Sequence, residues 1–582
     1  MRGISNPRDF QIDAIRLLAF TPNTLLYLIA KTGGGKSAVP LTVGTLKSGV
    51  IVTLVPLIGL GSDQVTKSRN ANHYVEAYHL DEQNTESSRE LSKRLNSLHQ
   101  SEANHCTIIL YVSPRALQME SHWLKLLERL ARRGYLRLLC IDEAHAIEQD
   151  GRRFRPEFVS AAQNLMMLHN LMPEKCSIVC MSATFRQSDQ QTLTGLLKRH
   201  PDQVMWLRLD RRRIGFTVGI SGSPYAAIKC SMTSDYAKTR QSKTLVYTNS
   251  KRKAIDSLVP MCESVLATHK ITGEVISLTG DDGIKQKMML MEAFCNADLE
   301  DNIAVGENNG ETNADSIVLP RLLAMPATSA ANCGVSSVNC HNSYRLGFPP
   351  SMHMLLQEFG RVDRDQTLQP GENKYTVELS FMCFVSIYSR VMKEPNASDR
   401  RKQLRSLFDV LDVLVSPEKC QHVLMEEYFE NPERGIDNRA ACGSLCSYCR
   451  DLSHEERAPW NLGRINRKYL TDRLIYFFNG NTASPAGLIR FIKTNKRRIL
   501  EGYTMTMGDK STSAIHALCL LLLRLRIIEI NTKEGRKEGG SGIEVVLRLG
   551  RMNDSMAIVS DMVWASVPTF DEESEGGGEG KG

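Results

Sequence analysis

The sequence predicts an α/β protein built around a parallel β-sheet. Short apolar runs alternate with segments of helical character through the first half of the chain, and this alternation is typical of parallel sheets. A glycine-rich loop follows the first apolar run and a pair of acidic residues follows another, at the strand ends where such sheets bind ligands. At 582 residues the chain is too long for one core, so we expect about three or four domains.

The composition is that of an ordinary globular protein, with 42% hydrophobic and 24% charged residues. The net charge of +7 is compatible with a polyanionic partner if the basic residues cluster. The first ten residues are polar, and the apolar stretch 517–523 is short and followed by Arg524, so we expect neither a signal peptide nor a membrane span. Eleven of the fifteen cysteines are scattered, which indicates free thiols in a reducing, intracellular compartment.

Five apolar runs in the first part of the chain predict buried parallel strands. They lie at 25–29, 50–55, 106–112, 136–141 and 177–181. Because the carboxyl ends of parallel strands meet at one edge of a sheet, we expect the polar residues that follow these runs to form one site.

The segment from Ala30 to Ser37 follows the first run and reads Ala-Lys-Thr-Gly-Gly-Gly-Lys-Ser. Glycines let successive backbone N–H groups turn toward phosphate oxygens, and a following helix N-terminus adds positive potential. Apart from Ala30, which stands at the first glycine position, this is the pattern of a phosphate-binding loop. It predicts that Lys36 contacts the β- and γ-phosphates of a nucleotide and that the Ser37 hydroxyl is a Mg²⁺ ligand. The loop residues expected beside them are Thr32, Gly33, Gly34 and Gly35.

Asp142 and Glu143 follow the run 136–141 and begin the tetrapeptide Asp-Glu-Ala-His, which ends at His145. An acid at a strand end beside a phosphate loop can hold Mg²⁺, and the next carboxylate can orient an attacking water as general base. We therefore predict Asp142 as a metal ligand and Glu143 as the base. Upstream, the amide of Gln11 can read the edge of an adenine base.

These motifs, in this order, resemble the first lobe of superfamily-two helicases and most of all the RecQ family. The matching segments are Gln11, 30–37, 56–60 with Asp63 and Gln64, 111–114, 142–145 and 182–184. The resemblance implies two RecA-like lobes that bind ATP and Mg²⁺ between them, with Arg8 and Gln11 as nucleotide contacts. It also implies that His145, Ser182 and Thr184 link the nucleotide site to DNA.

A loop after the DEAH tetrapeptide is the particular mark of the family, in which it couples DNA contact to ATP hydrolysis. Here the Gly-x-x-Phe-Arg-Pro-Glu half fits, and Arg152, Phe154 and Arg155 are candidates for this role. The other half departs from the pattern, because Asp150-Gly151-Arg152 stands where the family usually has Trp-Gly-His. A solvated basic loop is the alternative interpretation.

The second lobe is expected to begin with a strand at 243–248 and to contain a polar surface insertion at 297–314. The motif at 327–336 is degenerate, since Asn332 and Ser336 replace the family's glycine and acid or amide. The last motif, from Gln357 to Arg364, is better preserved and places Gln357 at the nucleotide. We predict Arg364 as the arginine finger and Arg361 as its neighbour, which would stabilise charge that develops during phosphoryl transfer. Asp363 stands where a glycine is usual.

Four cysteines, Cys420, Cys442, Cys446 and Cys449, have spacing suited to a closed, tetrahedral Zn²⁺ site. His422 is an alternative ligand. The aromatic-Glu segment after Cys420 also resembles the RecQ zinc-binding subdomain, although three residues separate Cys442 from Cys446 where the family has two.

The region 460–499 is basic, and a helix at 513–525 is followed by strands at 526–530 and 543–549 with a charged turn at 533–542. A helix and a hairpin in this place resemble the winged-helix domain of the family, which binds duplex DNA. A basic helical domain that only packs on the motor is the alternative. The tail from Asp571 is rich in Glu and Gly, which predicts disorder.

These observations define five predicted segments: lobe 1 (1–207), lobe 2 (208–395), a zinc subdomain (396–456), a winged-helix-like domain (457–560) and an acidic tail (561–582). The resemblance implies an ATP-dependent DNA helicase of DNA repair or recombination that travels 3′ to 5′ and binds single-stranded and duplex DNA. We expect it in the nucleus if the organism is eukaryotic and in the cytoplasm otherwise. Two alternatives remain open: a catalytically weakened DNA-binding relative, motivated by Asp150, Asn332, Ser336 and Asp363, and a DEAH-type RNA helicase.

Overall fold

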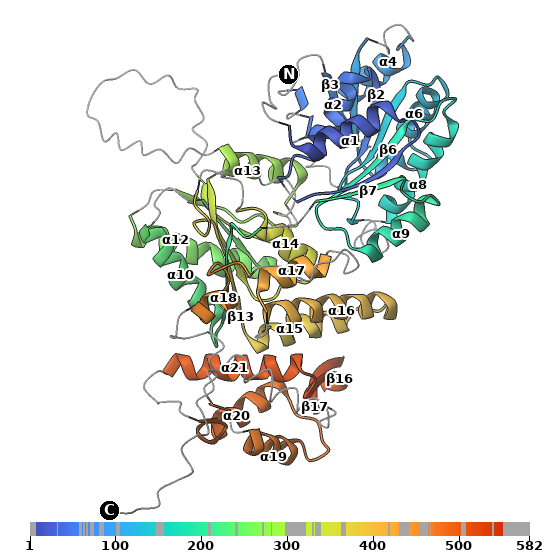
Figure 1. Cartoon of the computed structure of the whole chain (residues 1–582). Coiled ribbons are helices and arrows are strands. Elements are labelled where there is room, and N and C mark those ends of the chain that lie inside the picture. Colours follow the sequence, from blue (N-terminus) through green and yellow to red (C-terminus); the bar gives the residue numbers. More distant parts are fainter. Residues whose placement is uncertain are drawn as a thin grey trace, which may run out of the picture.

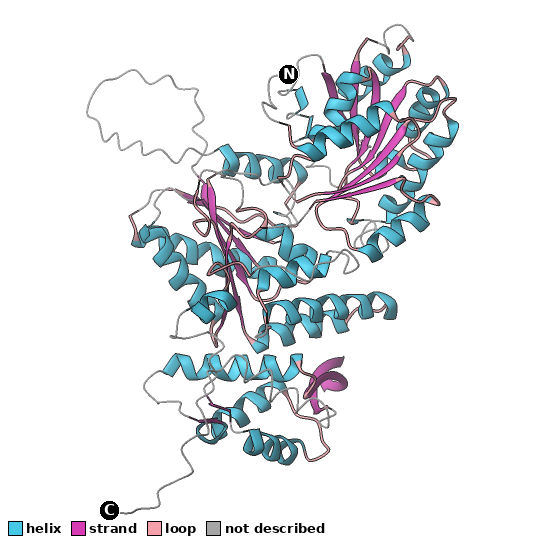
Figure 2. Ribbon diagram, viewed as in Figure 1, coloured by secondary structure: helices cyan, strands magenta, loops and turns pink. Residues whose placement is uncertain are grey.

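The structure is a computed structural model of the 582-residue chain. The residues that it describes are 7–31, 33–56, 61, 64–65, 68–69, 75–80, 86–99, 105–146, 156–207, 211–238, 243–270, 273–280, 282–296, 322–328, 331, 339–362, 368–416, 419–429, 441–453, 464–465, 467–501, 508–537 and 540–550. Two separate sheets flanked by helices form most of the molecule, and a helical C-terminal part follows them (Figure 2).

Lobe 1, as described from residue 7 to residue 207, is built on a seven-stranded sheet in the order β3-β4-β2-β5-β6-β1-β7. Every pairing in it is parallel. The strands are β1 (Leu25–Ile29), β2 (Gly49–Leu54), β3 (Val75–Leu80), β4 (Thr107–Val112), β5 (Leu136–Ile141), β6 (Ser177–Ser182) and β7 (Gln203–Trp206). The five strands expected from apolar runs are therefore confirmed, within one residue at the ends.

Both faces of this sheet are buried because neighbouring side chains of a strand point to opposite sides. Leu25 and Tyr27 of β1 join one core cluster, whereas Leu26 and Leu28 join another. The second cluster packs against α1 (Asp9–Phe20) and α2 (Ala38–Leu46). The first packs against α4 (Glu86–Asn96), η1 (Arg115–Leu117), α6 (His122–Arg132), α8 (Pro156–Leu171) and α9 (Gln187–Leu197). Figure 1 shows α1 and α2 on the side of the sheet opposite α8 and α9.

Lobe 2, as described from residue 211 to residue 392, has a six-stranded parallel sheet in the order β10-β11-β9-β12-β13-β8. Its strands are β8 (Gly215–Ile220), β9 (Lys243–Tyr247), β10 (Glu274–Val275), β11 (Leu322–Ala327), β12 (Cys340–Leu346) and β13 (Lys374–Leu379). Its helices are α10 (Pro224–Lys238), α11 (Lys251–Lys253), a π-helical turn η2 (Ala254–Leu258), α12 (Val259–Thr268), α13 (Ile284–Asn296), α14 (Met352–Phe359) and α15 (Phe381–Met392). The strand expected at 243–248 is confirmed as β9, and the expected insertion at 297–314 lies outside the described residues.

Three helices continue the chain beyond lobe 2: α16 (Ala397–Leu414), α17 (Gln421–Phe429) and α18 (Ser447–Ser453). They share one hydrophobic core with α14 and α15. In Figure 1, α17 lies beside α14 on the side of lobe 2 that faces lobe 1. The segment 396–456, which contains the four predicted zinc ligands, therefore reaches the boundary between the lobes.

The C-terminal domain, described at 464–465, 467–501, 508–537 and 540–550, contains α19 (Arg467–Phe478), α20 (Pro485–Ile499), α21 (Gly508–Arg524) and the hairpin β16 (Ile528–Lys537) with β17 (Gly540–Leu549). A short antiparallel pair, β14 (Arg464–Ile465) and β15 (Leu500–Glu501), completes it. The helix followed by a hairpin agrees with the predicted order of elements. The charged turn expected at 533–542 is corrected, because the two strands pair as far as Lys537 and Gly540.

Within the part of the chain that the structure describes, no helix is both long enough and apolar enough to cross a membrane.

Candidate functional site

The glycine loop leaves the end of β1 and enters α2, as the sequence predicts. Gly33 and Gly35 have φ angles of 76° and 86°, a region that L side chains rarely adopt. A Cβ on Gly35 would also lie 2.6 Å from the Gln11 side-chain nitrogen. Glycine is therefore required where the loop turns against α1.

Lys36 is buried, with 8% of its surface exposed, and its ammonium lies inside the loop. Its Nζ donates to the backbone oxygens of Ala30, at 2.7 Å, and of Lys31, at 3.3 Å. Ser37 is exposed at the start of α2, where its Oγ accepts a hydrogen bond from the Gln64 side chain at 3.3 Å. The loop thus presents one cation and one hydroxyl at a helix N-terminus, an arrangement suited to a phosphate and its metal ion.

Arg8 and Gln11, predicted as nucleotide contacts, lie against the same loop. Arg8 donates from Nη1 to the Gly34 oxygen at 3.0 Å, and Gln11 donates from Nε2 to the Gly35 oxygen at 2.9 Å. The Gln11 carbonyl oxygen accepts from the Arg8 backbone N–H at 2.9 Å. Both residues therefore hold the phosphate loop directly. Thr32 lies outside the described residues.

Asp142 stands at the carboxyl end of β5, two strands from β1 in the sheet order. Burial and the neighbouring Glu143 carboxylate raise the pKa of Asp142, while the Lys36 ammonium acts in the opposite direction. An acidic group that is costly to ionise beside a lysine is suited to a divalent cation, because the cation's charge favours the carboxylate. Glu143 has a φ of 49°, in the left-handed region, and such strain is common at functional sites.

His145, the last residue of the tetrapeptide, connects three elements. Its Nδ1 lies 3.0 Å from the Ser182 Oγ at the end of β6 and 3.3 Å from Glu143 Oε2. Its Nε2 lies 3.0 Å from the side-chain nitrogen of Gln357 on α14. An amide nitrogen can only donate, so Nε2 accepts and Nδ1 is the nitrogen that carries the ring hydrogen. The predicted residues His145, Ser182 and Gln357 thus form one chain of contacts from lobe 1 to lobe 2.

Ser182 and Thr184 form a compact turn behind His145. The Thr184 backbone N–H donates to the Ser182 Oγ at 3.1 Å, and both residues are buried. The Ser182 backbone oxygen in turn accepts from Ala30 at 3.0 Å. The turn therefore touches both the start of the phosphate loop and the DEAH histidine.

Arg361 follows α14 and is buried in lobe 2, with 7% of its surface exposed. The end of α14 is fixed by Glu358, which bonds to the fully buried Arg345 at 2.7 Å and accepts from the Tyr375 hydroxyl at 2.7 Å. Arg364, the predicted finger, lies outside the described residues. So do Arg152, Phe154 and Arg155, together with the departures at Asp150, Asn332, Ser336 and Asp363. Their predicted roles stay predictions.

The four predicted cysteines come together at the edge of lobe 2. All four are buried, and their sulfur atoms lie within 4.8 Å of one another. The sulfurs of Cys420 and Cys446 are 3.8 Å apart, and sulfurs at Zn–S distances of about 2.3 Å in a tetrahedron would be about 3.8 Å apart. The set of donors and its geometry therefore fit a structural zinc ion.

His422, the alternative ligand, has a different contact. Its Nε2 lies 3.1 Å from the backbone oxygen of Ile214 and donates to it. This bond joins α17 to the residue before β8. Because the four sulfurs already form a complete set of donors, His422 serves to dock α17 on lobe 2.

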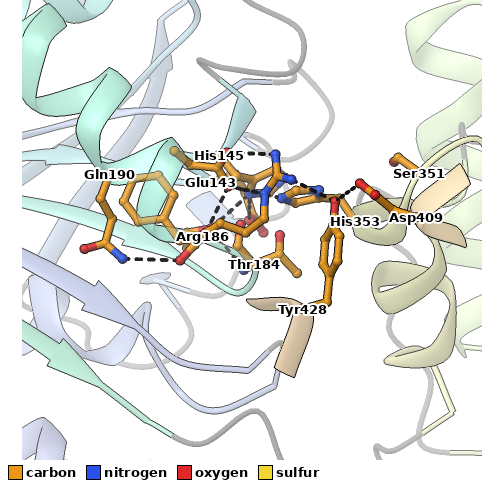
Figure 3. Close-up of polar contacts among 12 residues, drawn as sticks. Glu143, His145, Thr184, Arg186, Gln190, Ser351, His353, Asp409 and Tyr428 are labelled. Carbon is orange, nitrogen blue, oxygen red and sulfur yellow. Dashed lines mark hydrogen bonds and ion pairs between the residues drawn. The ribbon is translucent and has the colours of Figure 1, made fainter. Parts of the chain in front are cut away.

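A second polar cluster, which no sequence motif indicates, lies beside His145 and is drawn in Figure 3. The His353 ring, on α14, stacks on the His145 ring with centroids 5.6 Å apart and an angle of 22° between the planes. Its Nε2 lies 3.4 Å from Asp189 Oδ2 of α9. The other oxygen of Asp189 is 3.2 Å from Arg186, which donates to the Tyr428 hydroxyl of α17 at 2.8 Å. Lobe 1, lobe 2 and α17 meet at this cluster.

The comparisons with known proteins agree with this arrangement. The family model for DEAD/DEAH box helicases matches residues 8–193, which include the phosphate loop and the DEAH tetrapeptide. The chain is 24% identical over 451 residues to the ATP-dependent DNA helicase RecQ of Bacillus subtilis, a match that covers 77% of this chain and 65% of that protein. It is 21% identical over 472 residues to the ATP-dependent helicase SGS1 of Saccharomyces cerevisiae, covering 76% of this chain and 28% of that protein.

The matched part is thus less than two thirds of either relative's own length. Among solved structures, the helicase Lhr of Mycobacterium smegmatis bound to single-stranded DNA and AMP-PNP is 13% identical, with a TM-score of 0.49 and coverage of 96% of this chain and 84% of that one. Residues 8–193 therefore match a DEAD/DEAH box helicase domain. Over about three quarters of its length the chain is similar to helicases of the RecQ family.

Proposed function

We propose that this protein is an ATP-dependent DNA helicase. The observation that most supports the proposal is the contact between His145 and Gln357, because it joins the predicted ATP-binding edge of lobe 1 to α14 of lobe 2, the helix that leads to Arg361. Such a contact is what a motor needs if the state of the nucleotide is to change the position of one lobe relative to the other. The names of the relatives, which are DNA helicases, support DNA as the substrate.

In the proposed reaction, Lys36 binds the terminal phosphates and Ser37 and Asp142 hold Mg²⁺. The metal ion supplies charge neutralisation on the phosphates when bound. Glu143, adjacent to this position, orients the attacking water and accepts its proton. Arg361 and Arg364 approach from lobe 2 and stabilise the charge of the transferring phosphoryl group.

We also propose that the four-cysteine cluster holds a structural zinc ion. Each ligand comes from a buried thiol, and the Cys442 and Cys446 thiols lower the pKa of Cys420 by donating to its thiolate.

The proposed direction of travel, 3′ to 5′, rests on the family resemblance. Strand displacement on substrates with 3′ or 5′ overhangs tests the direction of travel, and steady-state ATP hydrolysis on the same substrates shows whether the motor is active.

The deciding experiment compares ATP hydrolysis by the full chain with no nucleic acid, with single-stranded DNA and with single-stranded RNA. We expect strong stimulation by DNA, weak stimulation by RNA, and no hydrolysis in Lys36→Ala. Lys47→Ala is a matched control, since Lys47 lies beyond the C-terminus of α2. Stimulation by RNA alone would favour an RNA helicase. Tight DNA binding with hydrolysis no faster than Lys36→Ala would leave a DNA-binding protein without a motor.

A further inference from the structure

The cluster around His353 is the strongest feature that the proposed reaction does not use. His353 is almost completely buried, with 3% of its surface exposed, and it lies between two elements of lobe 1 and one of the zinc-bearing segment. Its ring is stacked on His145, its Nε2 faces Asp189, and the Phe429 ring meets it edge-on with centroids 5.0 Å apart. These three contacts hold the His353 ring in one orientation.

His145 has two different contacts to satisfy, one on each nitrogen. Nε2 must accept from Gln357 while Nδ1 donates to the Ser182 hydroxyl and lies 3.3 Å from Glu143 Oε2. A rotation of the ring by half a turn, or a move of the hydrogen to Nε2, would break both contacts. The stacked His353 ring covers one face of His145 and leaves no room for such a rotation without displacing a buried side chain.

His353 is itself held in place by charge. Contacts with His353 and Arg186 lower the pKa of Asp189 to about 2 against the effect of its burial, so this carboxyl is ionised. Burial lowers the pKa of His353 to about 4 although Asp189 acts to raise it, so the ring is neutral and faces the carboxylate with an N–H. Arg186 holds the other side of Asp189 and is bound in turn by Tyr428, which also donates to Asp409 at 2.9 Å.

We infer that His353 is a positioning residue for the DEAH histidine. By stacking on His145 it fixes that ring's orientation and tautomer, and so keeps the bond between His145 and Gln357 aligned across the lobes. The Asp189–Arg186–Tyr428 contacts anchor His353, which makes the zinc-bearing helix α17 part of the same support. The effect on hydrolysis rests on the proposed function, whereas the effect on the His145 ring does not.

The first test measures the ring directly by nitrogen NMR of the full chain labelled with ¹⁵N-histidine, in which His145→Gln identifies the His145 signals. We expect the unsubstituted chain to show His145 with its hydrogen on Nδ1, and His353→Gln to show a mixture of the two tautomers. His169→Asn is the matched control, because His169 is also buried in lobe 1 but contacts the backbone of Cys176. An unchanged His145 tautomer in His353→Gln would overturn the inference.

The second test is a double-mutant cycle on DNA-stimulated hydrolysis. A residue that modulates a site from outside it typically changes the coupling by about 0.5–2 kcal/mol, so kcat should fall about twofold to thirtyfold in His353→Gln, with little change in the KM for ATP. In the His145→Gln background the same substitution should have no further effect, since the ring it positions is gone. An equal loss in both backgrounds would mean that His353 only stabilises the fold.

Asp189→Asn serves as a second variant if His353→Gln does not fold, since it removes the charge that faces His353 and keeps its volume. It should lead to the same mixture of tautomers and to the same loss of kcat. If the unsubstituted chain shows no hydrolysis beyond that of Lys36→Ala, the proposed function fails. The NMR result then decides the inference about His353 by itself.

Discussion

At the scale of single residues, one buried acid has no chemical role in the proposed reaction. Glu378 at the carboxyl end of β13 is 6% exposed, and burial alone raises its pKa from 4.5 to about 7. The carboxyl fits there because Gly219 on the neighbouring strand β8 has no side chain, and a Cβ at Gly219 would lie 2.3 Å from Glu378 Oε1. The side chain therefore has enough space, but the cost of burying its negative charge is not offset.

The pKa of Glu378 predicts a pH-dependent cost to stability. The folded state holds the proton more tightly than the unfolded state, so this group destabilises the fold as the pH rises from about 4.5 through about 7. One pKa unit corresponds to about 1.4 kcal/mol, so Glu378→Gln should raise the free energy of unfolding by about 1–3 kcal/mol at pH 8 and change it little at pH 4. Denaturant unfolding at both pH values measures this. Glu120→Gln, at an exposed position, is the control, and an equal gain at both pH values would contradict the explanation.

At the scale of elements, the cysteine knuckle at 442–449 closes an edge of the lobe 2 sheet. β8 is the last strand in the sheet order, and the segment that bears the cysteines pairs with it. The Phe216 backbone N–H donates to the Leu445 oxygen at 2.6 Å, and the Val218 N–H donates to the Ser447 hydroxyl at 2.8 Å. Exposed edge strands tend to pair with other chains, so the knuckle also protects the β8 edge of lobe 2 from such pairing.

Loss of one thiolate should therefore affect the whole sheet. We expect Cys446→Ser to lower the bound zinc per chain, to reduce the free energy of unfolding by more than about 3 kcal/mol, and to promote aggregation. Metal analysis, thermal unfolding and light scattering measure the three effects. Cys230→Ser is the control, since Cys230 is an exposed thiol on α10. Full stability in Cys446→Ser after removal of metal by a chelator would show that the knuckle docks without zinc.

Prediction from the sequence succeeded where one local pattern determined an element. The five strands of lobe 1 that lie in continuous apolar runs were predicted correctly, because strands buried on both faces need apolar residues throughout. β13 (Lys374–Leu379) and β12 mix apolar with polar residues, and they were not predicted. In the C-terminal hairpin the sequence predicts strands at 526–530 and 543–549 and a charged turn at 533–542, whereas cross-strand pairing extends the two strands to Lys537 and Gly540.

The same distinction holds for the site. Lys36, Asp142 and Glu143 follow strands in recognisable motifs, so their meeting at one edge follows from a parallel sheet. No sequence motif indicates the contact between His353 and Asp189, since 164 positions separate the two residues and either could be an ordinary polar residue. Only the packing of α14 against α9 brings them to His145.

At the scale of the whole molecule, the cores divide the chain into two cooperative parts. The two clusters of lobe 1 contain only residues up to 207. By contrast, one continuous cluster joins lobe 2, helices α16 to α18 and the C-terminal domain. At its boundary the Tyr388 hydroxyl donates to the Ile530 oxygen at 2.9 Å, and the Arg526 guanidinium lies 4.1 Å from the centre of the Phe408 ring. In Figure 1, α21 of the C-terminal domain lies next to α15 and α16, and α19 and α20 lie farther from lobe 2.

This division predicts two calorimetric transitions, one for lobe 1 and one in which lobe 2 and the C-terminal domain unfold together. The double variant Tyr388→Phe with Arg526→Ala removes a buried hydrogen bond and a cation–π contact, worth about 2–3 kcal/mol together. It should separate an early transition for the C-terminal domain and speed its release by limited proteolysis, while lobe 1 melts as before.

The matched control is Tyr476→Phe with Arg490→Ala, which makes the same chemical changes at exposed positions of the same domain. These substitutions should leave both transitions where they are, because neither side chain lies in the shared core. A C-terminal domain that melts separately in the unsubstituted chain would contradict the prediction. The shared core would then hold the domain too weakly to make it part of lobe 2, and the hairpin could not move with lobe 2 as one body during hydrolysis.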